Sequence, residues 1–106
     1  MLKDFYEGTT LAFDAYVYMN GLLQDISADS VFFIMKKLKT DSDAETVIYA
    51  QAFDCSANGV AQFEIDATDT EVEPRNYYYE LKWVSGTKIY ILESGEVRVL
   101  DRIFDV

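Results

Sequence analysis

The sequence predicts an all-β protein, an antiparallel β-sandwich of about seven strands that forms a single domain over residues 1–106. Apolar residues recur at every second position in short stretches, and turn-forming residues separate these stretches. No stretch shows the 3.6-residue period of an ordinary helix, and no repeat or linker divides the chain. Strands at this spacing are typical of two packed sheets, and a small closed barrel is the alternative.

The first two predicted strands cover residues 10–19 and 30–38. In the first, alternation assigns five apolar side chains to the core face: Leu11, Phe13, Ala15, Val17 and Met19. Asn20-Gly21 then allows a tight hairpin, although the residues after it favour a wide connection. In the second strand the core face holds three further apolar side chains: Val31, Phe33 and Met35.

The next two strands are predicted at residues 46–54 and 60–66, on either side of the Asn58-Gly59 turn signal. The earlier one begins with β-branched and aromatic residues, which strands favour. The later one directs three apolar side chains inward: Ala61, Phe63 and Ile65. After it, Thr68 or Asp69 could cap one short helical turn, which Pro74 prevents from continuing.

The fifth predicted strand contains three consecutive tyrosines and the single tryptophan. Its core face consists of alternating large side chains: Tyr77, Tyr79, Leu81 and Trp83. The opposite face carries Glu80 and Lys82, so Tyr78 is predicted to be exposed. Tyr77 also stands where sandwiches place a tyrosine corner, and its hydroxyl is expected to bond to backbone within residues 69–73.

The last two strands are predicted at residues 88–94 and 96–104. A compact turn at residues 85–87 precedes the first of them, and Gly95 is expected to separate the two.

The charge of the chain excludes several classes of function. Nineteen acids against nine bases give a net charge of −10, which is the wrong sign for displacing counterions from nucleic acid or for docking on an anionic membrane. No signal peptide and no apolar stretch of about 20 residues is present, so we expect no membrane partner. The single Cys55 rules out an internal disulfide.

Neither catalysis nor metal binding is expected. Acids cluster around Asp43 and Asp69, but neither cluster has the spacing of a calcium loop, and solvated loop acids are the simpler interpretation. Zinc requires four ligands, and the chain has no histidine and one cysteine. Asp54 next to Cys55 is expected to make that thiol less acidic. We therefore predict a non-enzymatic protein without a cofactor.

Five apolar or aromatic side chains are predicted to face away from the core: Tyr16, Tyr18, Phe32, Ile34 and Tyr78. If they are contiguous, they form a partner-binding surface. Scattered exposure, which is normal for soluble proteins, is the alternative.

The second half of the chain resembles a segment common in small tail and baseplate proteins of tailed bacteriophages. The resemblance lies in a strand and turn, a proline, a run of tyrosines and a final strand, with these matching positions: Gly59, Phe63, Ile65, Asp69, Thr70, Pro74, Tyr77 to Leu81, Gly95, Val97 and Val99. Residues 25–37 match more loosely. The phage segment usually has glycine after the proline, whereas Arg75-Asn76 stand here, and Asn76 tolerates the same positive φ.

This resemblance implies an immunoglobulin-like sandwich in a phage virion, similar to upper-baseplate domains and to receptor-binding-protein shoulders. The expected function is assembly or adaptor contact with other phage structural proteins, with homo-oligomers allowed. The protein would be made in the cytoplasm of the bacterial host. A ligand-binding sandwich that recognises host-surface carbohydrate or protein is the alternative function.

Overall fold

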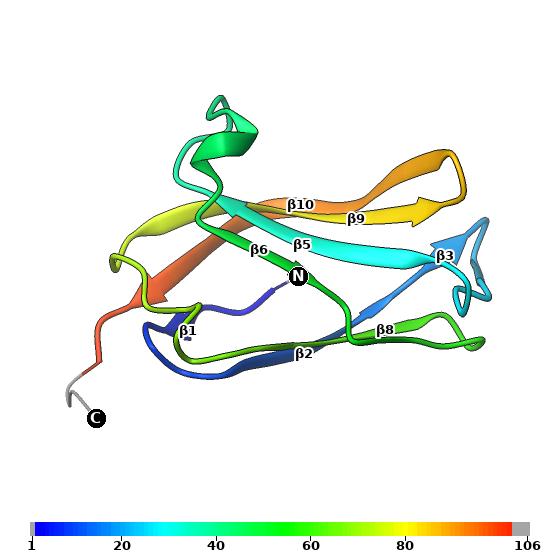
Figure 1. The fold of residues 1–106 in the computed structure, drawn as a ribbon, viewed down its shortest axis with the longest axis horizontal. Helices are drawn as coiled ribbons and strands as arrows, with labels where there is room; N and C mark the ends of the chain where they lie inside the picture. Colours follow the sequence, from blue (N-terminus) through cyan, green and yellow to red (C-terminus); the bar gives the residue numbers. More distant parts are fainter. Residues whose placement is uncertain (1, 103–106) are drawn as a thin grey trace.

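A computed structural model describes residues 2–102, which form two β-sheets packed face to face (Figure 1). The larger sheet contains five strands, in the order β1 (Phe5–Tyr6), β10 (Lys88–Leu100), β9 (Asn76–Ser85), β5 (Ser30–Lys36) and β6 (Ile48–Gln51). The smaller sheet contains β2 (Leu11–Tyr16), β8 (Val60–Ile65) and β7 (Asp54–Cys55). A separate hairpin joins β3 (Tyr18–Met19) to β4 (Leu22–Leu23), and the three-residue 3-10 turn η1 spans Asp43–Glu45. The all-β prediction is confirmed.

The core lies between the two sheets and contains the side chains that alternation assigned to it. Val31, Phe33 and Met35 are fully buried on β5, and the inward residues of β8 and β9 are buried as well. Phe13 of β2 stacks on Phe63 of β8 with ring centroids 4.8 Å apart, and it meets Phe33 of β5 edge-on at 5.6 Å. These aromatic contacts join the smaller sheet to the larger one.

The strand order favours the immunoglobulin-like interpretation. If β2, β5 and β6 are taken as strands B, C and C′, and β7 to β10 as D, E, F and G, the sheets read G-F-C-C′ and B-E-D. These are the orders of variable-type immunoglobulin sandwiches. The expected tyrosine corner also forms, since the Tyr77 hydroxyl donates to the Glu73 carbonyl at 2.5 Å. The finer classification stays a prediction.

The third predicted strand divides between the two sheets. The Ala52 N–H donates to the Val31 carbonyl of the larger sheet, and the next N–H, of Phe53, donates to the Gln62 carbonyl of the smaller sheet. The chain therefore crosses the sandwich between these residues and continues as β7. Alternation cannot reveal such a crossing, because both segments keep the same two-residue period.

The sixth and seventh predicted strands are one long strand, β10, so the prediction of a break at Gly95 is wrong. The register slips by one residue between Ile91 and Glu93, which is a β-bulge, and pairing with β9 continues through Gly95. The Tyr79 side chain covers this glycine, since a Cβ there would lie 3.4 Å from the tyrosine oxygen. Gly95 thus permits close packing. The predicted strand positions 103 and 104 lie outside the described residues.

Two connections differ from the expected ones. Asn20 and Gly21 have φ angles of 52° and 78°, so the tight hairpin forms, and a wide connection follows it over residues 24–29. After β8 there is a hydrogen-bonded turn and no helix, since the Asp69 and Thr70 N–H groups donate to the Asp66 carbonyl. The Thr70 side chain is fully buried there, and its hydroxyl lies 2.6 Å from the Thr9 carbonyl.

Two glycines with left-handed backbone provide a matched stability test. Gly59 (φ 78°) is crowded, because a Cβ would lie 2.9 Å from the Gln24 carbonyl oxygen, whereas Gly86 (φ 61°) has no atom within 4 Å of that position. We expect Gly86→Ala to cost about 1–2 kcal/mol of unfolding free energy from backbone strain alone. Gly59→Ala should cost about 3 kcal/mol, since the residue 22–24 segment must also shift. Urea unfolding measures both, and equal losses would mean that this segment does not press on Gly59.

Candidate interaction surface

The outward side of the larger sheet carries more apolar surface than a water-facing sheet requires. Along β5, β6, β9 and β10, residues that alternate with the core positions point outward, and a neighbouring group of them is apolar: Phe32, Ile34, Tyr49, Val84, Ile89 and Ile91. We call these six the outer patch. Tyr49, Ile89 and Ile91 are 60%, 63% and 53% exposed. Antiparallel sheets usually present polar side chains to water on such a face.

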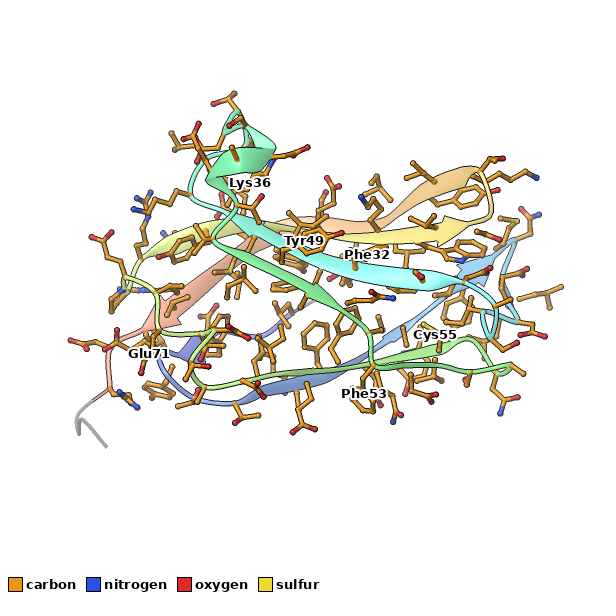
Figure 2. The ribbon with its side chains drawn as sticks, viewed as in Figure 1. Phe32, Lys36, Tyr49, Phe53, Cys55 and Glu71 are labelled. Carbon is orange, nitrogen blue, oxygen red and sulfur yellow. The ribbon has the colours of Figure 1, made fainter. Side chains whose placement is uncertain are left out.

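Strand register brings the outer patch together. Lys82 of β9 pairs with Phe32 on one side and with Ile91 on the other. Ile34 pairs with Tyr49, whose ring centroid lies 5.5 Å from that of Phe32. Figure 2 shows Phe32 and Tyr49 next to each other on β5 and β6. The Lys82 ammonium lies 5.4 Å from the centre of the Phe32 ring, a cation–π contact.

Charged side chains border the outer patch on the side of η1. Lys36 donates to the Asp43 carboxylate at 2.8 Å, and this hydrogen bond, together with the lysine charge, lowers the pKa of Asp43. Lys39 lies 5.1 Å from the centre of the Tyr78 ring. Between these groups is a groove of about 550 Å³, with Glu80 and Lys82 among its walls. Apart from Lys82, which lies within the outer patch against the Phe32 ring, the charged groups are at its border, as at the rim of many protein–protein interfaces.

The five predicted partner residues fall on three parts of the fold, so they do not make one contiguous patch. Phe32, Ile34 and Tyr78 lie on the outward side of the larger sheet and are half-buried. Tyr16 on β2 and Tyr18 on the β3–β4 hairpin are 55% and 56% exposed and belong to other parts of the fold. Alternation shows which residues face away from the core, but it does not show in which sheet each strand lies.

Sequence reasoning missed four members of the outer patch: Tyr49, Val84, Ile89 and Ile91. In β10, all residues from Ile89 to Leu92 are apolar or aromatic. The sequence pattern alone therefore could not show whether Ile89 and Ile91 or Tyr90 and Leu92 face outward. The structure decides it through Trp83, whose ring stacks on Tyr90 with centroids 4.7 Å apart. Tyr49 is flanked by Ile48 and Ala50, which are smaller and more apolar. This contrast was the available signal that Ile48 and Ala50 face the core and Tyr49 faces outward.

The groups considered for chemistry lie apart from one another. In residues 2–102, no three His, Cys, Asp or Glu side chains are arranged to hold a metal ion. Cys55 is half-buried at the end of β7, and burial, followed by the nearby Asp54 and Asp29 charges, raises the pKa of its thiol. No described helix is long and apolar enough to span a membrane.

Comparisons with known proteins give no relative. No protein-family model matches the chain, and no curated protein sequence is similar to it. The resemblance to phage tail and baseplate domains therefore stays a prediction.

Proposed function

We propose that the protein is a non-enzymatic assembly or adaptor component of a phage virion, in the tail or baseplate, and that it binds other structural proteins through the outer patch. The resemblance in the second half of the sequence supports the virion context. The outer patch supports the mode of action, because contiguous exposed apolar side chains on a soluble domain mark interaction sites.

The single observation that carries the proposal is the exposure of Tyr49, Ile89 and Ile91 on one side of the larger sheet, on strands β6 and β10 that flank β5 and β9. A stable core exists without them, since the core cluster lies on the opposite side of the same strands. Exposure of these three side chains lowers the solubility of the protein, and the stability of the fold does not require it. Specific docking on such a face buries about 1,200–2,000 Å² in total when both partners are counted.

The test removes the aromatic pair that the outer patch contains on β5 and β6. Phe32→Ser together with Tyr49→Ser, introduced in the genome that encodes the chain, should lower its occupancy in purified particles by about tenfold or more, since buried aromatics dominate binding energy. The matched control is Tyr6→Ser, which removes an aromatic that is 51% exposed on β1, at the opposite edge of the sheet from β6. Occupancy is measured by quantitative mass spectrometry of particles, and folding of each purified variant by circular dichroism. If the folded double variant were present in particles at full occupancy, the outer patch would not be the interface with other structural proteins.

A carbohydrate-binding module is the second candidate, and the groove beside Tyr78 favours it. Sugars bind where an aromatic ring lies among hydrogen-bonding groups, and this groove combines Tyr78 with Glu80, Glu96 and lysines. If purified protein bound a host-surface glycan, and if Tyr78→Ala abolished this binding while particle composition did not depend on the gene, this function would replace the first.

A further inference from the structure

The outward side of the smaller sheet is acidic. Across β2, β7 and β8, the residues that point away from the core include three acids, Asp14, Asp54 and Glu64, and no basic residue. Asp14 and Asp54 both pair with Gln62, so they stand in one row on either side of it. We call this side the acidic face.

Exposed aromatics accompany these carboxylates. Tyr16, at the end of β2, is 55% exposed, and Phe53, just before β7, is 64% exposed. Figure 2 shows Phe53 pointing away from the sandwich on the side of the smaller sheet. The acidic face therefore combines negative charge with apolar surface, which is the chemistry of a docking surface rather than of a purely solvated one.

The outward side of the larger sheet carries basic residues, which the acidic face lacks. Four of the nine basic residues of the chain lie on or over it: Lys36, Lys39, Lys82 and Arg98. Lys36 is paired with Asp43, whereas Lys39 and Lys82 contact aromatic rings, and within residues 2–102 neither has a carboxylate within ion-pair distance. Glu80 and Glu96 also lie on this side, so its charge is close to balanced in a chain of net charge −10.

We propose that the acidic face of one copy docks on the outer patch of the next copy, so that the chain associates head to tail. The inference rests on the proposed function of the outer patch as an assembly surface. Head-to-tail docking places Asp14, Asp54 and Glu64 opposite the lysines around the patch. A symmetric contact between two outer patches leaves these carboxylates without opposing charge. A symmetric contact between two acidic faces brings like charges together, which costs free energy.

The position of the two surfaces determines the kind of assembly. They lie on opposite sides of the sandwich, above the larger sheet and below the smaller one in the view of Figure 1. A contact between different surfaces of identical copies does not close as a dimer, and it continues into a ring or a filament. The fold therefore suits repetition of one contact around or along a particle.

The expected affinity is low. Strands β2 and β8 have six residues each and β7 has two, so the acidic face measures at most about 15 by 20 Å. A contact of about 300 Å² on each copy, about 600 Å² in total, is below the range of about 1,200–2,000 Å² that stable specific interfaces bury. The net charge of −10 on each copy also opposes association. We expect a dissociation constant of about 0.1–1 mM for the isolated chain, with repetition supplying stability in an assembled particle.

The experiment measures mass by sedimentation equilibrium up to about 1 mM protein, in about 0.15 M salt, where charge repulsion is screened beyond about 8 Å. One variant reverses the patch charges, Lys39→Glu with Lys82→Glu, and the other reverses the acidic face, Asp14→Lys with Glu64→Lys. The weight-average mass of the unmodified chain should rise with concentration, and each variant alone should stay monomeric. Mixing the two variants should restore association, because each then offers a surface of the opposite charge to the other.

Two outcomes would overturn the proposal. One is an unmodified chain that remains monomeric at about 1 mM. The other is an acidic-face variant that associates as well as the unmodified chain, which would indicate a symmetric contact or another surface. Neither outcome contradicts the proposed function, which the particle-occupancy experiment tests separately. If the Phe32 and Tyr49 double variant lost occupancy while the chain did not self-associate, the partner of the outer patch would be a different protein.

Discussion

Replacing Tyr77 by alanine should lower the free energy of unfolding by about 3–5 kcal/mol, the usual loss for a fully buried aromatic. The Tyr77 side chain is 0% exposed and fills the core beneath β9. Its hydroxyl also donates to the Glu73 carbonyl, which ties the loop before β9 to the sheet. Burial raises the pKa of this phenol, so the hydroxyl stays protonated and able to donate at neutral pH. Because one kcal/mol corresponds to about 4–8 °C for a domain of this size, the melting temperature should fall by more than about 10 °C.

Two matched variants separate the contributions of the ring and the hydroxyl. Tyr77→Phe keeps the ring and removes only the bond to Glu73, for which we expect about 1–2 kcal/mol. Tyr78→Ala, at the next position on the opposite face, should cost less than about 1 kcal/mol, as surface changes usually do. Chemical denaturation followed by circular dichroism ranks the three. If Tyr78→Ala proved the most damaging, the facing of β9 would be reversed and the core assigned here would be wrong.

The sequence was most informative about which side of each strand is buried. On β9 the alternating tyrosines, leucine and tryptophan left no choice of facing, because the other side carries Glu80 and Lys82. The tyrosine corner was predictable too, since it depends on a tyrosine just after a turn that ends in proline. Both features are local, and a two-residue period or a short motif records local structure directly.

Features that depend on contacts distant in sequence were not predictable. The crossing at Ala52 and Phe53 depends on bonds to Val31 and Gln62, and Gly95 continues β10 because it packs against Tyr79. Thr70 looked like an ordinary loop residue, yet its hydroxyl bonds to the carbonyl of Thr9, which lies 61 positions earlier.

The sequence predicted only part of the interaction surface, because that surface also depends on which strands lie side by side. Phe32 and Ile34 were identified because Val31, Phe33 and Met35 left no doubt about the facing of β5. Their neighbours on β6 and β10 could be added only once strand order placed those strands on either side of β5 and β9. The separation of Tyr16 and Tyr18 from this surface likewise follows from the assignment of β2 to the smaller sheet and of β3 to the separate hairpin.

Trp83 should be as important to stability as Tyr77, and for a related reason. Its side chain is only 5% exposed, it stacks on Tyr90, and its indole N–H donates to the Asp29 carboxylate at 2.9 Å. That bond fastens the end of the residue 24–29 connection to the larger sheet, just before β5 begins. We expect Trp83→Ala to cost about 3–5 kcal/mol, measured by urea unfolding with circular dichroism because the variant lacks the only tryptophan.

A double-mutant cycle isolates the indole bond from the packing of the ring. Trp83→Phe keeps an aromatic ring against Tyr90 but removes the donor, whereas Asp29→Ala removes the acceptor and leaves the indole in place. A hydrogen bond to a charged group contributes about 1.5–3 kcal/mol, so each single change should cost at least this much. The double change should lower the free energy of unfolding by less than the sum of the two single changes. The difference is the interaction energy, which is about 0.5–3 kcal/mol for residues in contact. Strict additivity would show that Trp83 and Asp29 stabilise the fold independently, and the connection would then be held by backbone bonds such as that from Asp29 N–H to the Ile26 carbonyl.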